Sequence, residues 1–478
     1  MARPMSNKSQ RTFHGAYGEF QWHITQLKGG AGSMLQPVER DLIRVGSRRW
    51  FLQVGMAGLG GLTLPQIAPL PGASVSAASQ QGDKKAVILI WLSGGPSHID
   101  MWDPKPDAPQ EIRGPFGVIS TKISGIQFCE HLPLQASIAD KLSVIRSVDC
   151  RASDHTPITM QACNPLARRT NDGKDGAGYP SMGSVAAKFR GPNDQDMPAF
   201  IGLADSWKSD VWEAGELGNR YAPVKGQELA GKFAMPAGIN VPRLHDREQL
   251  RRELDRLGRD LEQTHALDRL DNYSRQAYEM MLSGKVKHAF DLAAESEDTH
   301  AAYGRESIGQ KALLARRLVE AGVTFVLVSG AWGYFDHHGD NVRWGGIEKG
   351  LQPLLPRVDR MMYALVNDLQ QRGLLDNTLV MMMGEFGRSP VINKDAGRDH
   401  WTNVMSMIMA GGGLPHGQVI GATDSRGGAI ESGAVRPQDL AATTYRHLGI
   451  DNGAQWTNRR GRPISIVTES GRPIPELL

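Results

Sequence analysis

The stretch Ala86-Val87-Ile88-Leu89-Ile90-Trp91-Leu92, followed by Ser93-Gly94-Gly95-Pro96, decides the fold class of this 478-residue chain. Its apolar residues form one continuous run, whereas a strand with one solvated face alternates apolar and polar residues. Continuous apolarity is typical of a strand that is buried on both faces. The glycines and the proline that follow indicate a turn. The sequence therefore predicts a central strand of a parallel sheet.

Two further apolar runs resemble the first one, at residues 323–328 and 378–383. Each of them comes after a helical pattern, at residues 308–320 and about 354–371. Alternating helices and strands predict an α/β fold with a doubly wound, mostly parallel sheet that is flanked by helices. We expect residues 84–478 to form this fold as a single domain.

Other parts of the chain are less regular. Residues 100–240 are rich in Gly, Pro and Asp, and we expect long active-site loops around shorter elements there. Residues 246–297 are charged with a helical period, which predicts a peripheral helical layer. Residues 439–448 form an amphipathic pattern, which predicts a closing helix of the fold.

The N-terminal residues have the order of an export signal. Ser47-Arg48-Arg49-Trp50-Phe51-Leu52 precedes an uncharged, moderately apolar run and then small residues, and it resembles the twin-arginine signal. We expect residues 1–46 to be a disordered leader extension and residues 47–77 to be the signal peptide. The expected partner is the twin-arginine translocase, and the expected location is periplasmic or extracellular.

The apolar run is a poor membrane anchor. Pro65, Pro69 and Pro71 interrupt it, whereas a membrane span needs about 20 predominantly apolar residues. We therefore expect no stable membrane span in the mature chain. The leader is long for a signal peptide, and we hypothesise that translation starts at Met34. Peptides from residues 2–33 in the precursor would contradict this hypothesis.

Composition excludes several classes of protein. With 40% hydrophobic and 22% charged residues, the chain is neither disordered nor a polytopic membrane protein. The net charge is +3, but residues 1–50 hold eight basic and three acidic residues, so about −2 remains for the rest. A nearly neutral body gives no indication of nucleic-acid binding. The three cysteines allow at most one disulfide within the chain.

Acidic and histidine residues follow each predicted strand. Because parallel strands end at one edge of a sheet, we expect these loops to converge there, with a fourth loop around residue 155 as a further contributor. Carboxylate and imidazole groups suit Zn²⁺, Mn²⁺ or Fe ions, Mg²⁺ and Ca²⁺ being further possibilities. The candidate metal ligands are His98, Asp100, His155, Asp336, His338, Glu385, Asp399 and His400.

Two arginines in these loops are candidates for substrate binding. Arg388 or Arg398 would clamp an anionic ester oxygen with two parallel N–H groups. Simpler interpretations stay open for some neighbours. His98 could instead be a loop residue that only makes hydrogen bonds. His337 could be a neighbour of the ligands without binding the metal itself. The three methionines 381–383 are expected in the strand core rather than at a copper site, because consecutive strand residues face opposite ways.

Four motifs occur in order along the chain: Leu92-Ser93-Gly94-Gly95-Pro96-Ser97-His98-Ile99-Asp100, Phe335-Asp336-His337-His338-Gly339-Asp340-Asn341, Gly384-Glu385-Phe386-Gly387-Arg388-Ser389-Pro390 and Gly397-Arg398-Asp399-His400-Trp401. Together they resemble the domain of unknown function 1501 family over residues 84–450. This family is similar in fold to the alkaline phosphatase and sulfatase superfamily, whose members hold one or two metals at strand ends and hydrolyse phosphate or sulfate esters. The resemblance implies an alkaline phosphatase-like fold and a metal-binding role for Asp336, His338, Glu385, Asp399 and His400.

The chain departs from the superfamily at three points. The acid at the end of the first strand is replaced by Ser93-Gly94, so that Asp100 or His98 would have to reach back. An Asp-His pair is replaced by Glu385-Phe386, and the nucleophile has no clear match, Thr156 being the best candidate.

Two functions are therefore compatible with the sequence. One is an exported, metal-dependent hydrolase of small-molecule or carbohydrate phosphate or sulfate esters. The other is a non-catalytic periplasmic binding or envelope-assembly protein on a hydrolase-like scaffold.

Overall fold

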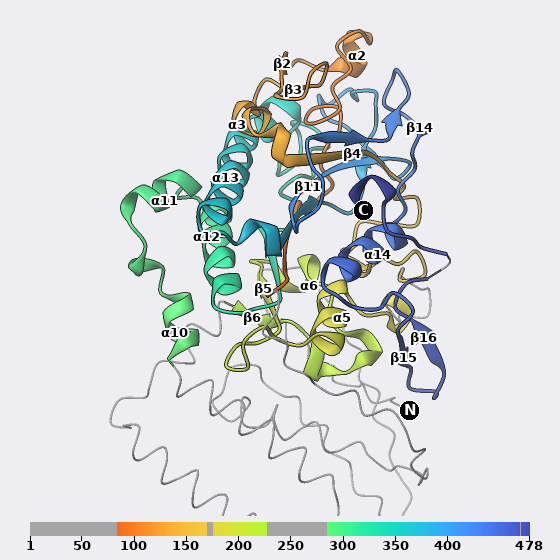
Figure 1. The fold of residues 1–478 in the computed structure, drawn as a ribbon. Coiled ribbons are helices and arrows are strands. Elements are labelled where there is room, and N and C mark those ends of the chain that lie inside the picture. The colour runs from red at the N-terminus through yellow and green to blue at the C-terminus, as the bar shows by residue number, and fades with distance from the viewer. Residues whose placement is uncertain (1–83, 170–174, 227–283, 469) are drawn as a thin grey trace, which may run out of the picture. The chain divides into compact units, whose positions relative to one another are not determined.

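Strand β1 (Ala86–Trp91) lies inside an eight-stranded sheet in the computed structural model (Figure 1). The structure describes residues 84–169, 175–226, 284–468 and 470–478. The expected leader and signal peptide, residues 1–77, lie outside the described residues. So does most of the expected helical layer, of which residues 284–297 are described.

The sheet has the order β12-β4-β11-β8-β1-β7-β5-β6. All neighbouring pairs are parallel except those of β11 with β4 and β8, so β11 alone runs in the opposite direction. The expected α/β class with a doubly wound, mostly parallel sheet is thus confirmed. The other seven strands are β4 (Leu142–Val148), β5 (Phe200–Leu203), β6 (Val224–Lys225), β7 (Phe325–Ser329), β8 (Thr378–Met383), β11 (Met405–Gly411) and β12 (Gln418–Ile420).

Helices cover both faces of this sheet (Figure 1). Helices α12 (Ser307–Glu320) and α13 (Gln352–Gln371) pack on one face, with Ile88 and Val326 among the sheet residues that they bury. Helices α5 (Met182–Phe189) and α14 (Pro437–His447) cover the other face. Successive residues of β8 alternate between the two faces, which places the fully buried Met381, Met382 and Met383 in the strand core, as predicted.

Short elements fill the connections, as expected for residues 100–240. Four two-stranded sheets pair β2 (Val118–Ser120) with β3 (Gln127–Cys129), β9 (Gly387–Arg388) with β10 (His400–Trp401), β13 (Ala422–Thr423) with β14 (Ile430–Ser432), and β15 (Gln455–Thr457) with β16 (Pro463–Ser465). The described residues also contain the α-helices α2 (Gln110–Arg113), α3 (Pro133–Ser137), α4 (Ile158–Ala162), α6 (Trp207–Asp210), α10 (Lys285–Phe290) and α11 (Glu297–Tyr303).

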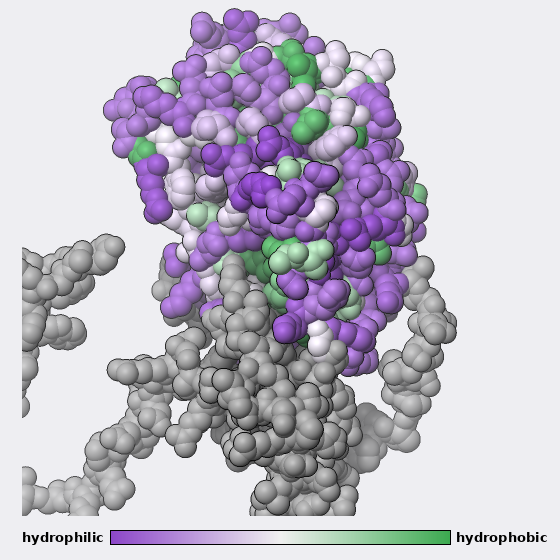
Figure 2. Space-filling model, turned by 90° about the vertical axis from the view of Figure 1, so that its left-hand side faces the viewer, coloured by the Kyte–Doolittle hydropathy of each residue, from purple (hydrophilic) through white to green (hydrophobic). Residues whose placement is uncertain are grey.

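The surface of the described residues is largely formed by the helices that cover the sheet. Figure 2 shows the face that carries α10 to α13 as mainly hydrophilic. Among the described residues, no helix has both the length and the apolarity to cross a bilayer. Cys129, Cys150 and Cys163 are all buried and unpaired, so no disulfide joins them.

Candidate functional site

Loops that follow four parallel strands meet at one edge of the sheet. His155 follows β4, Asp336 follows β7, and Glu385 follows β8 after one intervening glycine. His155 Nδ1 lies 3.0 Å from Glu385 Oε1, and His155 Nε2 lies 3.5 Å from Asp336 Oδ2. Contacts between residues that are 181 and 230 positions apart confirm the expected convergence of these loops.

The carboxylate of Asp336 is the hub of the cluster. Its Oδ1 accepts a hydrogen bond from Arg388 Nη2 at 2.6 Å. The same oxygen lies 3.1 Å from His338 Nε2 and 3.2 Å from His400 Nε2. The two histidine nitrogens are themselves only 2.8 Å apart. Asp336 therefore joins the loops after β7 and β8 to the strand β10.

A glycine makes this close approach possible. Gly94 follows Leu92 and Ser93 at the end of β1. It adopts φ +109°, a backbone conformation that residues with a side chain rarely adopt. A Cβ atom there would lie 2.5 Å from the backbone nitrogen of Asp336. The N–H of Gly94 donates to Glu385 Oε1 at 2.8 Å. The turn at the end of β1 thus holds the two acidic loops in place.

The charges of the cluster shift its pKa values in different directions. Burial alone would raise the pKa of Asp336, but His155, His400 and Arg388 together hold it far below its usual range. Burial would lower the pKa of His155, but the carboxylates of Asp336 and Glu385 outweigh it and raise the pKa to about 9. Burial lowers the pKa of His400, with Arg388 and His155 adding to the effect. Asp336 is accordingly an anion at any physiological pH.

The donor atoms fit a metal ion. One ligand atom each of His155, Asp336 and His400 lies within 4.8 Å of the others. His155 Nε2 and Glu385 Oε2 are buried and have no hydrogen-bond partner, which is costly unless something else binds them. Two imidazoles and carboxylate oxygens are a common donor set for Zn²⁺, Mn²⁺ and Fe.

His338 and Asp399 lie at the open side of the cluster. The side chains of His338 and His400 are 31% and 36% exposed, so solvent reaches the histidines. Asp399 is 66% exposed, and its Oδ1 lies 3.5 Å from His338 Nδ1. A carboxylate at the second ring nitrogen orients a histidine toward a bound ion.

The hydroxyl of Thr156 has a hydrogen-bond acceptor of its own. Its hydroxyl donates to Asp154 Oδ1 at 2.5 Å, and it is adjacent in sequence to His155. A hydroxyl that donates to a carboxylate has a partner that can take its proton. The sequence patterns indicated Thr156, and the structure adds Asp154 as the acceptor of its hydroxyl.

Both candidate arginines are buried, and their guanidinium groups already bind other protein groups. Arg388 donates to the backbone oxygens of Gly94, Gly95 and Arg398 as well as to Asp336. Arg398 forms a two-point ion pair with Asp100, at 2.7 and 2.9 Å. Each guanidinium is 1% exposed and tightens the loops of the site, so neither faces solvent to receive a substrate anion. Their role in anion binding stays a prediction.

His98 and Asp100 have contacts of their own. His98 Nε2 lies 2.8 Å from the carbonyl oxygen of Gly427, and Asp100 accepts from Ser97 as well as Arg398. Among the described contacts, none joins either residue to Asp336 or to a cluster histidine. The expectation that one of them reaches back to the end of β1 gains no support from these contacts.

Phe386 packs against two histidines of the cluster. Its ring centroid lies 5.5 Å from that of His155 and 4.5 Å from that of His400. His155 contacts Glu385 from the loop after β4. Sequence analysis also missed Asp210 on α6, a fully buried acid that accepts from the hydroxyl of Ser93. It lies in the stretch without a clear periodicity, where nothing distinguished it.

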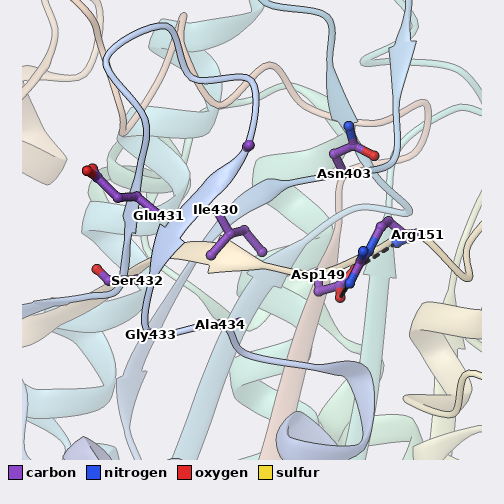
Figure 3. A pocket seen from close by; sticks show the side chains of 9 residues that line it. Asp149, Arg151, Asn403, Ile430, Glu431, Ser432, Gly433 and Ala434 are labelled. Atoms are coloured by element: carbon purple, nitrogen blue, oxygen red, sulfur yellow. Dashed lines mark hydrogen bonds and ion pairs between the residues drawn. The ribbon is translucent and has the colours of Figure 1, made fainter.

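A pocket of about 490 Å³ borders the same loops (Figure 3). Asp149, Arg151 and Asn403 line it together with residues 429–434. Arg151 precedes His155 by four residues and Asn403 follows His400 by three, so each lies within ~14 Å of a cluster histidine along the chain. Arg151 pairs with Asp149 through two contacts, at 2.9 and 2.6 Å. The lining therefore offers donors, acceptors and the apolar Ile430.

Comparison with known proteins gives a family but no curated relative. The family described as "Protein of unknown function (DUF1501)" matches residues 84–478. The family resemblance of the motifs is thus confirmed over a longer stretch than expected. No curated protein matches the chain.

Several solved structures are similar at low identity. Ps i-CgsB matches with a TM-score of 0.37 and 12% identity, over 77% of this chain and 72% of that one. The sulfatase PsFucS1 from Pseudoalteromonas sp. matches with a TM-score of 0.34 and 12% identity, over 78% of this chain and 69% of that one. The phosphonate monoester hydrolase SpPMH from Silicibacter pomeroyi matches with a TM-score of 0.31 and 11% identity, over 82% of this chain and 76% of that one.

Proposed function

We propose that this chain, which belongs to the DUF1501 family of proteins of unknown function, is a metal-dependent hydrolase of phosphate or sulfate esters. The observation that carries the proposal is the meeting of His155, Asp336 and His400, whose ligand atoms lie within 4.8 Å of one another. They come from three separate segments at the carboxyl edge of the sheet, where α/β proteins bind ligands.

The residues of the cluster have two proposed roles, binding the metal ion and positioning its ligands. His155, Asp336 and His400 would hold the ion, with Glu385 and His338 beside them. A divalent ion there would polarise the ester and stabilise the negative charge that develops on its oxygens. Arg388 and Asp399 would act as positioning residues, since one fixes Asp336 and the other contacts His338.

Thr156 is the proposed nucleophile. Its Oγ1 would form a bond to phosphorus or sulfur as its proton passes to Asp154 Oδ1, with which it already makes a hydrogen bond of 2.5 Å. The bond to the leaving alcohol breaks, and the alcohol oxygen takes up a proton from solvent water, while Asp154 keeps its proton until the threonine oxygen is released again. Water then attacks the esterified threonine, releases phosphate or sulfate and restores the hydroxyl.

The leaving alcohol would extend toward the pocket in Figure 3. Its lining includes Arg151, Asp149 and Glu431, so its formal charge is negative rather than positive. Mixed donors and acceptors beside an apolar side chain suit a polyhydroxylated group such as a sugar. The proposed substrate class is therefore a small-molecule or carbohydrate ester.

The test is turnover of a panel of phosphate and sulfate esters by the purified protein, with its metal content measured in parallel. We expect His400→Ala to lower both metal content and turnover, because it removes a ligand. His288→Ala, on the exposed face of α10, is the matched control and should change neither. Unchanged metal content in His400→Ala would refute the ligand assignment. Metal binding without turnover of any ester by the unmutated protein would contradict catalysis and favour a metal-bearing binding scaffold.

Export is the second part of the proposal. Residues 47–77 would direct the folded chain to the twin-arginine translocase and hence to the periplasm or beyond. Replacing both Arg48 and Arg49 by lysine should retain the protein in the cytoplasm of a bacterial host, as measured by cell fractionation. Export of this variant at the level of the unmutated protein would contradict the proposal.

A further inference from the structure

An exposed tryptophan lies beside the proposed metal centre. Trp332 is 39% exposed, and its ring centroid lies 5.4 Å from that of His155. His155 also contacts the ring of Phe386, but Phe386 is only 1% exposed. A proposed metal ligand therefore contacts one aromatic ring that the fold buries and one that stays open to solvent.

Exposed apolar residues gather at this edge of the sheet. In the described part of the chain, five large hydrophobic residues are exposed, and three of them follow β7 or β8. These three are Trp332, Val342 and Val391. The same two segments carry Asp336 and His400. A single exposed apolar residue is common on protein surfaces, whereas this concentration beside the site indicates a surface that binds apolar groups.

The turn that carries Trp332 is held from two sides. The N–H of Trp332 donates to Ser206 Oγ at 3.1 Å, directly before α6. The N–H of Gly333 donates to Ser93 Oγ at 3.2 Å, and the N–H of Phe335 donates to the carbonyl oxygen of Ser93 at 2.7 Å. Because its backbone is fixed, the indole ring loses little conformational freedom when a ligand binds to it.

Polar residues surround Ser206, the hydrogen-bond partner of Trp332. Asp205, Lys208 and Ser209 are all exposed and lie within three residues of it. An apolar ring next to charged groups and a hydroxyl is complementary to a sugar, which has an apolar C–H face and hydroxyl groups at its edge. An alkyl alcohol would offer nothing to these polar groups.

We propose that Trp332 selects the alcohol of the ester, by stacking its indole on a sugar ring next to the reacting group. This inference rests on the proposed function, because the indole contacts His155 of the proposed metal centre. The face of an indole is electron-rich and attracts the C–H groups of a sugar. Trp332 is not among the residues that line the pocket in Figure 3, so that pocket would bind a different part of the alcohol.

The experiment compares esters of two alcohols by equilibrium dialysis against full-length Thr156→Ala protein with its metal, counting intact ester on both sides of the membrane. The probes are the 6-phosphate and 6-sulfate of glucose, and the phosphate and sulfate of glycerol, which has hydroxyl groups but no ring. We expect a glucose ester to bind at least tenfold more tightly than the matching glycerol ester. Adding Trp332→Ala should weaken the glucose ester at least tenfold and change the glycerol ester less than twofold.

Two further variants distinguish stacking from simple apolar contact. Trp332→Phe keeps an aromatic face and should retain most of the preference for glucose. Trp332→Leu keeps an apolar side chain without a ring and should lose the preference. Leu478→Ala is the matched control, because Leu478 is 59% exposed and its neighbour Glu476 contacts Gln418 at the start of β12, at the opposite edge of the sheet. It should change no affinity.

The outcomes separate this inference from the proposed function. Equal binding of the glucose and glycerol esters, or a preference that persists in Trp332→Ala, would overturn the inference, while turnover by the unmutated protein would keep the proposed function. Ring-selective binding that depends on Trp332, without turnover of any ester, would overturn the hydrolase and leave the inference. Binding of none of the four esters would overturn both.

Discussion

At the scale of single residues, Asp336 determines the chemistry of the candidate site. Three positively charged or titratable groups surround one of its oxygens, namely Arg388, His338 and His400. Burial would raise the pKa of this carboxylate, but His155, His400 and Arg388 together hold it far below its usual range. A carboxylate fixed in this way is ready to bind a cation without first losing a proton.

Thr156 gives the most direct test of catalysis at this scale. Thr156→Ala should lower ester turnover by at least about 10³-fold, because the nucleophile is lost. Metal content should stay unchanged, since Thr156 is not among the proposed ligands. Thr156→Ser keeps a hydroxyl near Asp154 and should retain measurable turnover. Thr457→Ala, on an exposed strand residue, is the control. Full turnover by Thr156→Ala would rule out this nucleophile.

Some site residues could be predicted from the sequence and others could not. Asp336, Glu385 and His400 follow apolar runs in recognisable motifs, and the structure brings them together. Asp210 has no such signal, because a four-residue helix within an irregular loop delivers it. The pairing of Asp100 with Arg398 was also invisible, since it joins residues 298 positions apart.

At the scale of elements, the buried parallel strands were the most predictable. The expected strand at residues 378–383 has the observed bounds of β8, and the expected helix at 308–320 differs from α12 by one residue. Strand β11 was missed because its Met405-Ser406-Met407-Ile408-Met409 pattern favours no single period. Strand β4 was missed because Ser143, Arg146 and Ser147 interrupt its apolar residues. In both strands, tertiary burial outweighs weak local preference.

A buried arginine joins the helices on one face. Arg316 of α12 is fully buried, and it pairs with Glu295 at 2.8 Å, Glu320 at 2.9 Å and Asp368 of α13 at 2.8 Å. Residues 246–297 were expected to be a peripheral layer, yet Glu295 is 8% exposed in this network. Ion pairing thus adds to the buried apolar residues Val286 and Ala289 in connecting the described end of that segment to α12 and α13.

This network predicts a large loss of stability when it is broken. Arg316→Ala should lower the free energy of unfolding by about 3 kcal/mol, because it removes the fully buried cation that Glu295, Glu320 and Asp368 share. The loss stays at the low end of the range for a buried pair, since Arg317 still contacts Glu295 and Arg372 still contacts Asp368. The measurement is denaturant unfolding followed by circular dichroism. Lys122→Ala breaks an ion pair whose members are 57% and 47% exposed, and it should have almost no effect. Equal stability of the two variants would contradict the role given to Arg316.

At the scale of the whole molecule, the site exists only because the sheet brings distant loops together. His155 and His400 lie 245 positions apart, yet their ring centroids are 4.6 Å from each other. Parallel strands alone predicted that the loops would share an edge. Which side chains point inward depends on turns such as Gly94 and on partners such as Arg388, which the sequence pattern does not specify.

The central claim is that this edge of the sheet holds a metal ion. Elemental analysis of the exported protein, purified without chelators or metal-affinity steps, tests it most directly. We expect at least one equivalent of Zn, Mn or Fe per chain, and we expect its removal by a chelator to lower the melting temperature. Folded protein that contains no such metal, and that binds none when Zn²⁺ or Mn²⁺ is added back, would contradict it.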